Sequence, residues 1–171
     1  MGELGFFPPD ARVELLDGII ADMMPIGPHH ATRVDTLNEL FITISRRRWL
    51  VRVQNPVRLN DYSEPEPDVA ILRRDKSYEN SHPGPEDVYL LIEVSDSTLE
   101  SDRNVKLPLY GHAGIMEVWL VNLPDQCLEV YRDPHYTGYA DKKVLRPGDQ
   151  IAPAAFPDAV VSVGDLLSIP V

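Results

Sequence analysis

The stretch that decides the fold lies between residues 66 and 106 and contains Glu66-Pro67-Asp68-Val69-Ala70-Ile71, Leu90-Leu91-Ile92-Glu93-Val94-Ser95 and Asp102-Arg103-Asn104-Val105-Lys106. In the first two pieces, one carboxylate, Asp68 or Glu93, lies beside or within an apolar, β-branched run that is typical of a buried strand. A buried carboxylate is unfavourable unless it is paired or binds a cation. Two such acids on neighbouring strands can hold a hard cation through their oxygens and water, with Lys106 adding positive charge nearby. The pattern predicts the core of a metal-assisted hydrolysis site.

Each of these residues also has an ordinary structural interpretation. Asp68 follows a proline and could end a loop at the start of a strand. Glu93 could be a strand acid paired with an arginine, and Lys106 could be a solvated helix residue. Taken singly, each residue favours the ordinary interpretation. Together they favour a site, because burying both acids without a partner would be strongly destabilising.

Length and composition indicate one globular domain spanning residues 1–171, with residues 1–11 as an N-terminal arm. Hydrophobic residues make up 43% of the chain and charged residues 25%, and no apolar run approaches the ~20 residues that span a bilayer. The N-terminus lacks the pattern of a signal peptide. The single Cys127 excludes an internal disulfide and a thiolate zinc cluster, which favours a reducing, cytoplasmic setting. We expect Cys127 to be a small core residue.

The formal net charge of −11 counts against extensive sequence-independent binding to nucleic acid, which depends on Lys and Arg at phosphates. A local basic face remains compatible with the arginines of the first half of the chain: Arg46-Arg47-Arg48, Arg52, Arg58 and Arg73-Arg74. The first three could instead form a basic helix C-terminus. The chain contains no phosphate-binding glycine loop, no G-x-S-x-G and no H-E-x-x-H, so these enzyme classes have no motif support.

The first part of the chain predicts a β-hairpin followed by a helix. Residues 12–24 form the hairpin, because Asp17-Gly18 is typical of a type I′ turn, and Glu14 falls on its first strand. The helix runs from His29 to about Arg47, because one face carries apolar residues at helical spacing. His30 lies at the end of this face, where it could be a hydrogen-bonded residue at the edge of the core or could border a site. The face consists of His30, Val34, Leu37, Phe41 and Ile44.

The remainder of the chain predicts mostly strands. Asp102 is expected to cap a helix that ends at residues 112–114, with Pro108 kinking it or confining regular helix to one side. Residues 73–87 form a long polar loop, and residues 163–168 a short terminal helix. The expected strands are residues 50–59, in which Pro56 indicates a bulge or an edge, and residues 68–72, 88–94, 115–122, 127–132 and 139–145.

An ordered set of short motifs resembles the Uma-two family of endonucleases, which is part of the restriction-endonuclease-like superfamily named for the PD-(D/E)XK motif. The resemblance covers roughly Arg12 to Arg132. It implies an α/β (α+β) fold: a mixed central sheet flanked by helices, with an N-terminal β-hairpin and extra antiparallel strands. The motifs are Leu16-Asp17-Gly18, Met24-Pro25, His30, Glu66-Pro67-Asp68-Val69, Ile92-Glu93-Val94-Ser95, Ser97-Thr98, Asp102, Lys106, Tyr110, Gly114 and Trp119-Leu120-Val121.

The resemblance implies which residues carry the chemistry. Asp68 matches the first half of the superfamily motif and Glu93 the second, so both are catalytic and both would hold Mg²⁺, with Mn²⁺ as a substitute. Ser95 stands where the superfamily usually has lysine, and Lys106 on the following helix matches the displaced catalytic lysine. The positions of Glu14 and His30 match accessory members of the site. The implied reaction is hydrolysis of phosphodiester bonds in nucleic acid, with DNA as the expected partner.

The sequence leaves three hypotheses open. The first is a metal-dependent nuclease, which requires the two acids and Lys106 to converge on one point. The second is a nuclease-like domain without catalysis that acts as a binding or assembly module, favoured by the acidic charge and the displaced lysine. The third is a structural domain whose acids are paired by Arg52, Arg58 or Arg73. A homodimer is also expected, because exposed sheet edges and an apolar arm containing Phe6-Phe7 often pair.

Overall fold

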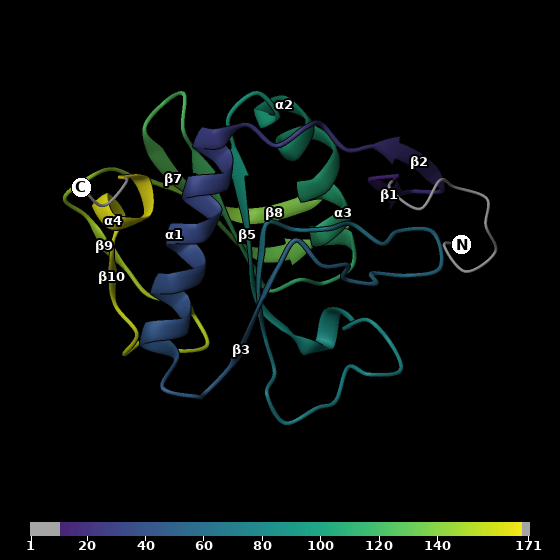
Figure 1. The fold of residues 1–171 in the computed structure, drawn as a ribbon, viewed down its shortest axis with the longest axis horizontal. Coiled ribbons are helices and arrows are strands. Elements are labelled where there is room, and N and C mark those ends of the chain that lie inside the picture. The colour runs from purple at the N-terminus through teal and green to yellow at the C-terminus, as the bar shows by residue number, and fades with distance from the viewer. Residues whose placement is uncertain (1–10, 169–171) are drawn as a thin grey trace.

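A computed structural model describes residues 11–168 and is built around one six-stranded sheet (Figure 1). Neighbouring strands are antiparallel except for the central pair β5–β6, which is parallel, so the sheet is mixed as predicted. In spatial order the strands are β3 (Leu50–Val53), β4 (Val69–Leu72), β5 (Val88–Ser95), β6 (Glu117–Asn122), β7 (Cys127–His135) and β8 (Gly138–Leu145).

Helices cover both faces of this sheet. Helix α1 (Pro28–Ser45) crosses one face, with α4 (Val163–Leu167) beside it (Figure 1). Helix α3 (Leu107–His112) packs on the opposite face and forms part of the crossover that joins the parallel strands β5 and β6. Each face has its own hydrophobic core, which accounts for the long apolar runs in the central strands.

The two faces of β5 have different chemistry because successive side chains of a strand point to opposite sides. Ile92 and Val94 pack into the core beneath α1. Leu91 packs on the α3 side, and the polar residues Glu93 and Ser95 share that side by alternation. On β5, the buried polar side chains Glu93 and Ser95 therefore lie on the α3 side of the sheet.

The N-terminal hairpin consists of β1 (Val13–Leu16) and β2 (Ile19–Asp22). Its turn residues Asp17 and Gly18 have φ angles of 49° and 80°, which confirms the prediction of a turn with positive φ at both positions. The hairpin is attached to the loop before β4, because the Glu64 amide donates a 2.8 Å hydrogen bond to the Leu15 carbonyl.

Helix α1 forms where its apolar face predicted it. Its C-cap residue Arg46 adopts a left-handed conformation with φ of 47°. Arg48 pairs with Asp158 at 2.7 Å and lies over the Trp49 ring, so it has structural partners. The buried residues of the predicted face are Val34, Leu37 and Phe41.

Two predictions about element boundaries are wrong. The strand predicted for residues 50–59 ends at Val53, because Gln54 turns the chain with a left-handed φ of 49° at the edge of the sheet. Asp102 is also not an N-cap. The helical segment begins at Leu99, and the Asp102 amide already donates to the Thr98 carbonyl at 2.9 Å, as it does inside a helix.

The crossover is one helical segment in three parts. It comprises α2 (Leu99–Ser101), a π-helical turn η3 (Asp102–Lys106) and α3. The longer α-helical part, α3, begins at Leu107, directly before Pro108, and the π-helical turn separates it from the three residues of α2. Pro108 lies in the first turn of α3 and has no N–H to donate to the preceding turn.

The other predicted elements are present with small differences. The polar loop of residues 73–87 ends in a short 3₁₀ turn, η2 (Pro85–Asp87). A small second sheet, β9 (Gln150–Ile151) with β10 (Val161–Ser162), leads into α4. Cys127 is buried, as expected.

Two further expectations are not decided by the fold. Phe6-Phe7 lies outside the described residues, so self-association stays a prediction. No helix in the described part of the chain has the length and apolar character needed to cross a membrane. The cytoplasmic setting stays a prediction as well.

Candidate active site

The register of two central strands brings the predicted acids together. Val69 of β4 pairs with Ile92 of β5, which places Asp68 beside Glu93 at the end of the ladder. The Asp68 amide lies 3.4 Å from Oε2 of Glu93 and donates to it. The Val94 amide donates a 2.8 Å hydrogen bond to Oδ2 of Asp68. Both carboxyl groups are thus fixed by backbone amides of the neighbouring strand.

Glu93 is almost completely buried, with 3% of its surface exposed. The hydroxyl of Tyr110, on α3, donates a 2.6 Å hydrogen bond to Oε1 of Glu93. Burial raises the pKa of Glu93 to about 8; the positive charge of Lys106 opposes this shift and the charge of Asp68 adds to it. When a cation takes the place of the proton on such a buried carboxyl group, it stabilises the ionised form.

Lys106 joins the acids to the hairpin. Its Nζ lies 3.5 Å from Oε1 of Glu93 and 3.3 Å from Oε2 of Glu14, which is on β1. The Glu66 amide also donates to Oε2 of Glu14, at 3.3 Å. Burial acts to lower the pKa of Lys106, but the charges of Glu93 and Glu14 outweigh it and raise the pKa. Lys106 is therefore a buried cation at neutral pH.

His30 borders the same site from the first turns of α1. Its Nε2 lies 2.8 Å from Oδ1 of Asp68, and this hydrogen bond raises the pKa of His30 above its ordinary value of 6.5. Gln54 contacts the same oxygen of Asp68 through Nε2 at 3.4 Å. We did not predict Gln54 from the sequence. The available signal was a polar residue that follows directly after a strand.

Asp102 is a second residue whose position the sequence did not predict. Only 4% of its surface is exposed, and its Oδ2 accepts hydrogen bonds from Ser95 Oγ at 2.6 Å and Thr98 Oγ1 at 2.7 Å. Burial raises the pKa of Asp102, against the effect of the Ser95 hydrogen bond and the Lys106 charge. The sequence signal was present but ambiguous, because an aspartate before a helix is most often an N-cap.

The hypothesis that Arg52, Arg58 or Arg73 pairs with the acids is wrong. Within residues 11–168, no ion pair joins an arginine to Asp68 or Glu93. The three arginines have contacts elsewhere: Arg58 pairs with Asp61, Arg73 donates to the Glu86 carbonyl, and Arg52 lies over the Tyr78 ring. The charge that faces Glu93 belongs to Lys106.

The two carboxylates fit a hard cation that keeps most of its water. Among residues 11–168, no three His, Cys, Asp or Glu side chains are grouped so that they could hold a metal ion together. Zn²⁺ sites use three or four protein ligands, so the residues present do not suit zinc. Mg²⁺ retains several waters and is commonly held by one or two carboxylates. Asp68 and Glu93, which are adjacent and buried, match that requirement.

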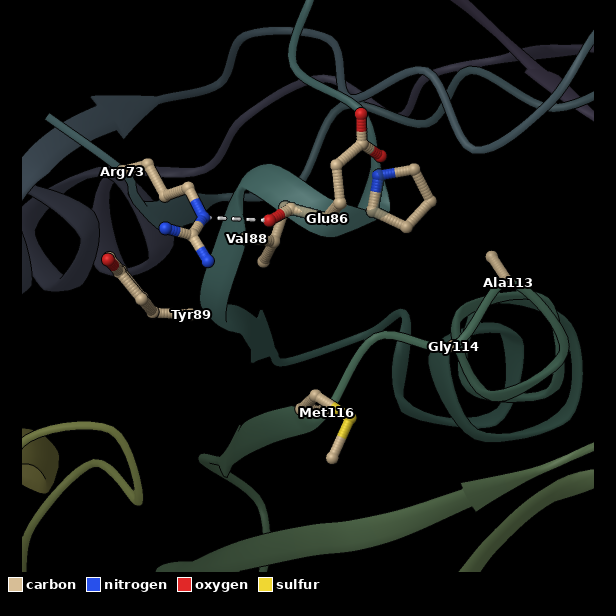
Figure 2. Close-up of a pocket in the computed structure, with 8 residues that line it drawn as sticks. Arg73, Glu86, Val88, Tyr89, Ala113, Gly114 and Met116 are labelled. Carbon is tan, nitrogen blue, oxygen red and sulfur yellow. Dashed lines mark hydrogen bonds between the residues drawn. The ribbon is translucent and has the colours of Figure 1, made fainter. Parts of the chain in front are cut away.

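The structure also has a surface pocket of about 580 Å³, and Figure 2 shows the residues that line it. It is lined by Tyr89, near the start of β5, by Met116, which precedes β6, and by Arg73, which donates a 3.0 Å hydrogen bond to the Glu86 carbonyl. Tyr89 is four residues before Glu93 along the strand, which corresponds to about 13 Å. The pocket therefore does not adjoin the acids.

The fold and the site together define a class of protein. A mixed sheet carries two acids on adjacent strands, and the crossover helix between the parallel strands brings a lysine to them. This arrangement is that of a restriction-endonuclease-like protein. The family model described as "Putative restriction endonuclease", Uma2, matches residues 3–164. The chain belongs to this family.

A solved structure has the same fold. It is the crystal structure of "a putative nuclease belonging to DUF820 from Anabaena variabilis ATCC 29413". The TM-score is 0.72, with 96% of this chain and 94% of that chain covered, at 18% sequence identity. This likeness confirms the predicted fold class. No curated protein sequence matches the chain.

Proposed function

We propose that the protein is a Mg²⁺-dependent endonuclease that hydrolyses phosphodiester bonds of DNA. The observation that carries the proposal is the convergence of Asp68, Glu93 and Lys106, from two strands and a helix, on one buried point. The family description, which names restriction endonucleases, supports DNA as the substrate. Membership in the family supports hydrolysis as the reaction.

Asp68 and Glu93 would hold the cation. When bound there, Mg²⁺ supplies Lewis acidity that lowers the pKa of water and offsets negative charge on the phosphate. The hydrogen bond from Tyr110 orients Glu93, and the contact with His30 orients Asp68. These contacts leave the carboxylates little freedom to rotate away from the ion.

Lys106 would act as a fixed positive charge. Its raised pKa keeps it protonated at neutral pH, so it suits stabilisation of negative charge in the transition state better than proton abstraction. Glu14 holds the ammonium group from the hairpin side at 3.3 Å. The hairpin thereby contributes to the position of Lys106.

The test is cleavage of supercoiled plasmid, single-stranded DNA and RNA with Mg²⁺, Mn²⁺ or EDTA. The variants are Glu93→Gln, Asp68→Asn and Lys106→Met, with Glu100→Gln as the matched control because Glu100 is an exposed acid on the same helical segment. We expect metal-dependent cutting of DNA that the three variants lose and the control retains.

Two outcomes would count against the proposal. Cutting that persists in Glu93→Gln would place the activity in another site or in a contaminant. Absence of cutting on every substrate and metal would favour the alternative of a nuclease-fold binding or assembly module. A parallel Mg²⁺ titration separates binding from catalysis, because Asp68→Asn and Glu93→Gln should abolish the metal signal while the fold is retained.

A further inference from the structure

The α3 side of the sheet carries two buried glutamates in one row. Glu93 of β5 pairs with Leu120 of β6, and Leu120 pairs with Glu129 of β7, so the two glutamates are two strands, or about 10 Å, apart. The π-helical turn η3 lies above this row and presents a cation to each acid. Lys106 contacts Glu93, and Arg103 contacts Glu129 through both Nε and a terminal nitrogen.

Asp102 ties the same turn to the end of β5. Its Oδ2 accepts hydrogen bonds from the Ser95 and Thr98 hydroxyls at 2.6 and 2.7 Å, and Ser95 itself is completely buried. Asp102 and Arg103 are neighbours in sequence, so η3 is fixed at two adjacent positions to two different strands. Lys106 follows in the same turn.

The backbone of η3 makes this fixation relevant to Lys106. The Leu107 amide donates to the Asp102 carbonyl, which is the wider π-helical hydrogen bond and not the α-helical bond to Arg103. Short π-helical turns are rare and occur often at functional sites. If the turn relaxed to α-helical geometry, the rotation of its residues would move Lys106 away from Glu93.

We propose that Ser95 and Asp102 are positioning residues for Lys106. Their hydrogen bond fixes η3 to β5, and the Arg103–Glu129 ion pair fixes it to β7. We call these two interactions together the clamp. They hold the Lys106 ammonium group beside Glu93. Ser95 acts on Lys106 indirectly, through the turn that carries both Asp102 and Lys106. The inference rests on the proposed function only in giving Lys106 a part in cleavage.

A first experiment does not require activity. Reductive methylation of the folded protein, followed by peptide mass spectrometry, measures how fast each lysine amine reacts. Lys106 should react slowly in the wild type, because only 11% of its side chain is exposed. In Ser95→Ala and Asp102→Ala it should react about tenfold faster, since a hydrogen bond to a charged group shifts an opening equilibrium by at least that factor.

Matched variants keep this experiment specific. Asp96→Ala removes an exposed aspartate beside Ser95 and should leave Lys106 protected. Asp102→Asn keeps an oxygen that can accept both hydroxyls and should restore most of the protection. Lys143, whose side chain is 59% exposed, reports on general reactivity. Unchanged protection of Lys106 in folded Ser95→Ala and Asp102→Ala would overturn the proposal; if Asp102→Ala does not fold, Ser95→Ala decides.

A second experiment asks whether the clamp acts through Lys106. In plasmid cleavage, Asp102→Ala should lose about 10- to 100-fold in rate with unchanged Mg²⁺ affinity. The double variant Asp102→Ala, Lys106→Met should be no slower than Lys106→Met alone, because both changes remove the same interaction. Additive losses would show that Asp102 acts independently of Lys106. If the wild type does not cleave, the proposed function fails and the methylation experiment alone decides the role of the clamp.

Discussion

Glu93 and Glu129 occupy one row of the sheet, on either side of Leu120, yet their pKa values shift in opposite directions. Burial would raise both. For Glu129 the donors from Arg103 and other side chains outweigh burial and lower the pKa to about 2. For Glu93 the charge of Lys106 and the hydrogen bond from Tyr110 do not outweigh burial, and the pKa rises to about 8. One acid of the row is fully neutralised by protein groups, and the other remains available to a cation.

The raised pKa of Glu93 predicts a pH-dependent cost to stability. The folded state holds the proton more tightly than the unfolded state, where the pKa is near 4.5. The resulting stabilisation is complete below pH 4.5 and is lost as pH rises through about 8. The free energy of unfolding should therefore fall as the pH rises through this window.

Glu93→Gln removes this loss because glutamine stays neutral. Urea unfolding is measured in EDTA from pH 4 to pH 9. As the pH rises through the window, the free energy of unfolding of the variant should increase relative to that of the wild type. The Glu100→Gln control changes an exposed acid and should follow the wild type. Parallel pH profiles for wild type and Glu93→Gln would contradict the burial argument.

Glu129→Gln should give the opposite pH dependence. A depressed pKa contributes stability that is present above the unfolded value of 4.5 and lost as pH falls through about 2. At pH 7 the free energy of unfolding of the variant should be lower by about 1–3 kcal/mol, because hydrogen bonds to a charged group are lost. The cost is limited because Arg103, left without this partner, is partly exposed to solvent. Between pH 4.5 and 2 the difference should shrink, and it should vanish only below about pH 2.

An exposed ion pair on the neighbouring strand is the control for this prediction. Asp141 and Lys143 on β8 lie 3.8 Å apart, with 44% and 59% of their side chains exposed. Asp141→Asn should change stability by less than about 1 kcal/mol at any pH. Thermal unfolding at pH 2.5, 4.5 and 7 compares the two variants. Equal effects would mean that burial of Glu129 adds nothing to its ion pair.

Local chemistry made parts of the fold predictable from sequence. The Asp17-Gly18 turn needs positive φ at two successive residues, and few sequences supply it. Helix α1 follows from the spacing of Val34, Leu37 and Phe41, which any packed helix must respect. These signals depend on residues a few positions apart, so no knowledge of the rest of the chain was needed.

Boundaries set by distant contacts could not be predicted in this way. Gln54 ends β3 in a left-handed conformation and contacts Asp68, fourteen positions along the chain. The Asp102 side chain bonds to Ser95 at the end of β5 in place of capping its own helix. In both cases tertiary contacts override the local preference of the residue.

The site illustrates the same limit. A lone acid inside an apolar strand singled out Glu93, but Glu117 of β6 and Glu129 of β7 show the same pattern and are also buried. Glu117 pairs with Arg132 and Glu129 with Arg103, and neither partner is adjacent in sequence. The pattern identifies buried acids, while the partner that neutralises each one depends on the fold. Glu14 is assigned to the site only by the family resemblance, whereas His30 also lies at the end of the apolar helix face, where the sequence leaves its role open.

His30 should titrate above its ordinary pKa of 6.5, because its strongest interaction is the hydrogen bond with Asp68. Asp68→Asn removes the negative charge and should lower the pKa of His30. The pH dependence of the imidazole resonances in NMR spectra, recorded in EDTA, measures this directly. Resonances of His135 at the far end of β7 should coincide in both proteins. If His30 has the same pKa in the wild type and in Asp68→Asn, the two side chains do not interact and His30 is not part of the site.

Close contact between α3 and β8 depends on a glycine. A Cβ atom at Gly111 would lie 2.1 Å from the carbonyl oxygen of Gly138, which is backbone and cannot rotate away. Gly111→Ala must therefore displace α3 from the sheet, and overpacking of this kind typically costs about 1–3 kcal/mol. Tyr110 precedes this glycine and donates to Glu93, so the displacement should reach the site.

Two measurements check this prediction together. Thermal unfolding should show a clear destabilisation of Gly111→Ala, whereas Gly27→Ala, which meets nothing within 4 Å, should cost less than about 1 kcal/mol. Loss of the Tyr110 hydrogen bond should also move the titration of Glu93, observed by NMR of its side-chain carboxyl carbon. If Gly111→Ala is as stable as Gly27→Ala, α3 can move away from β8 without strain. The close packing of α3 on the sheet would then not position the site.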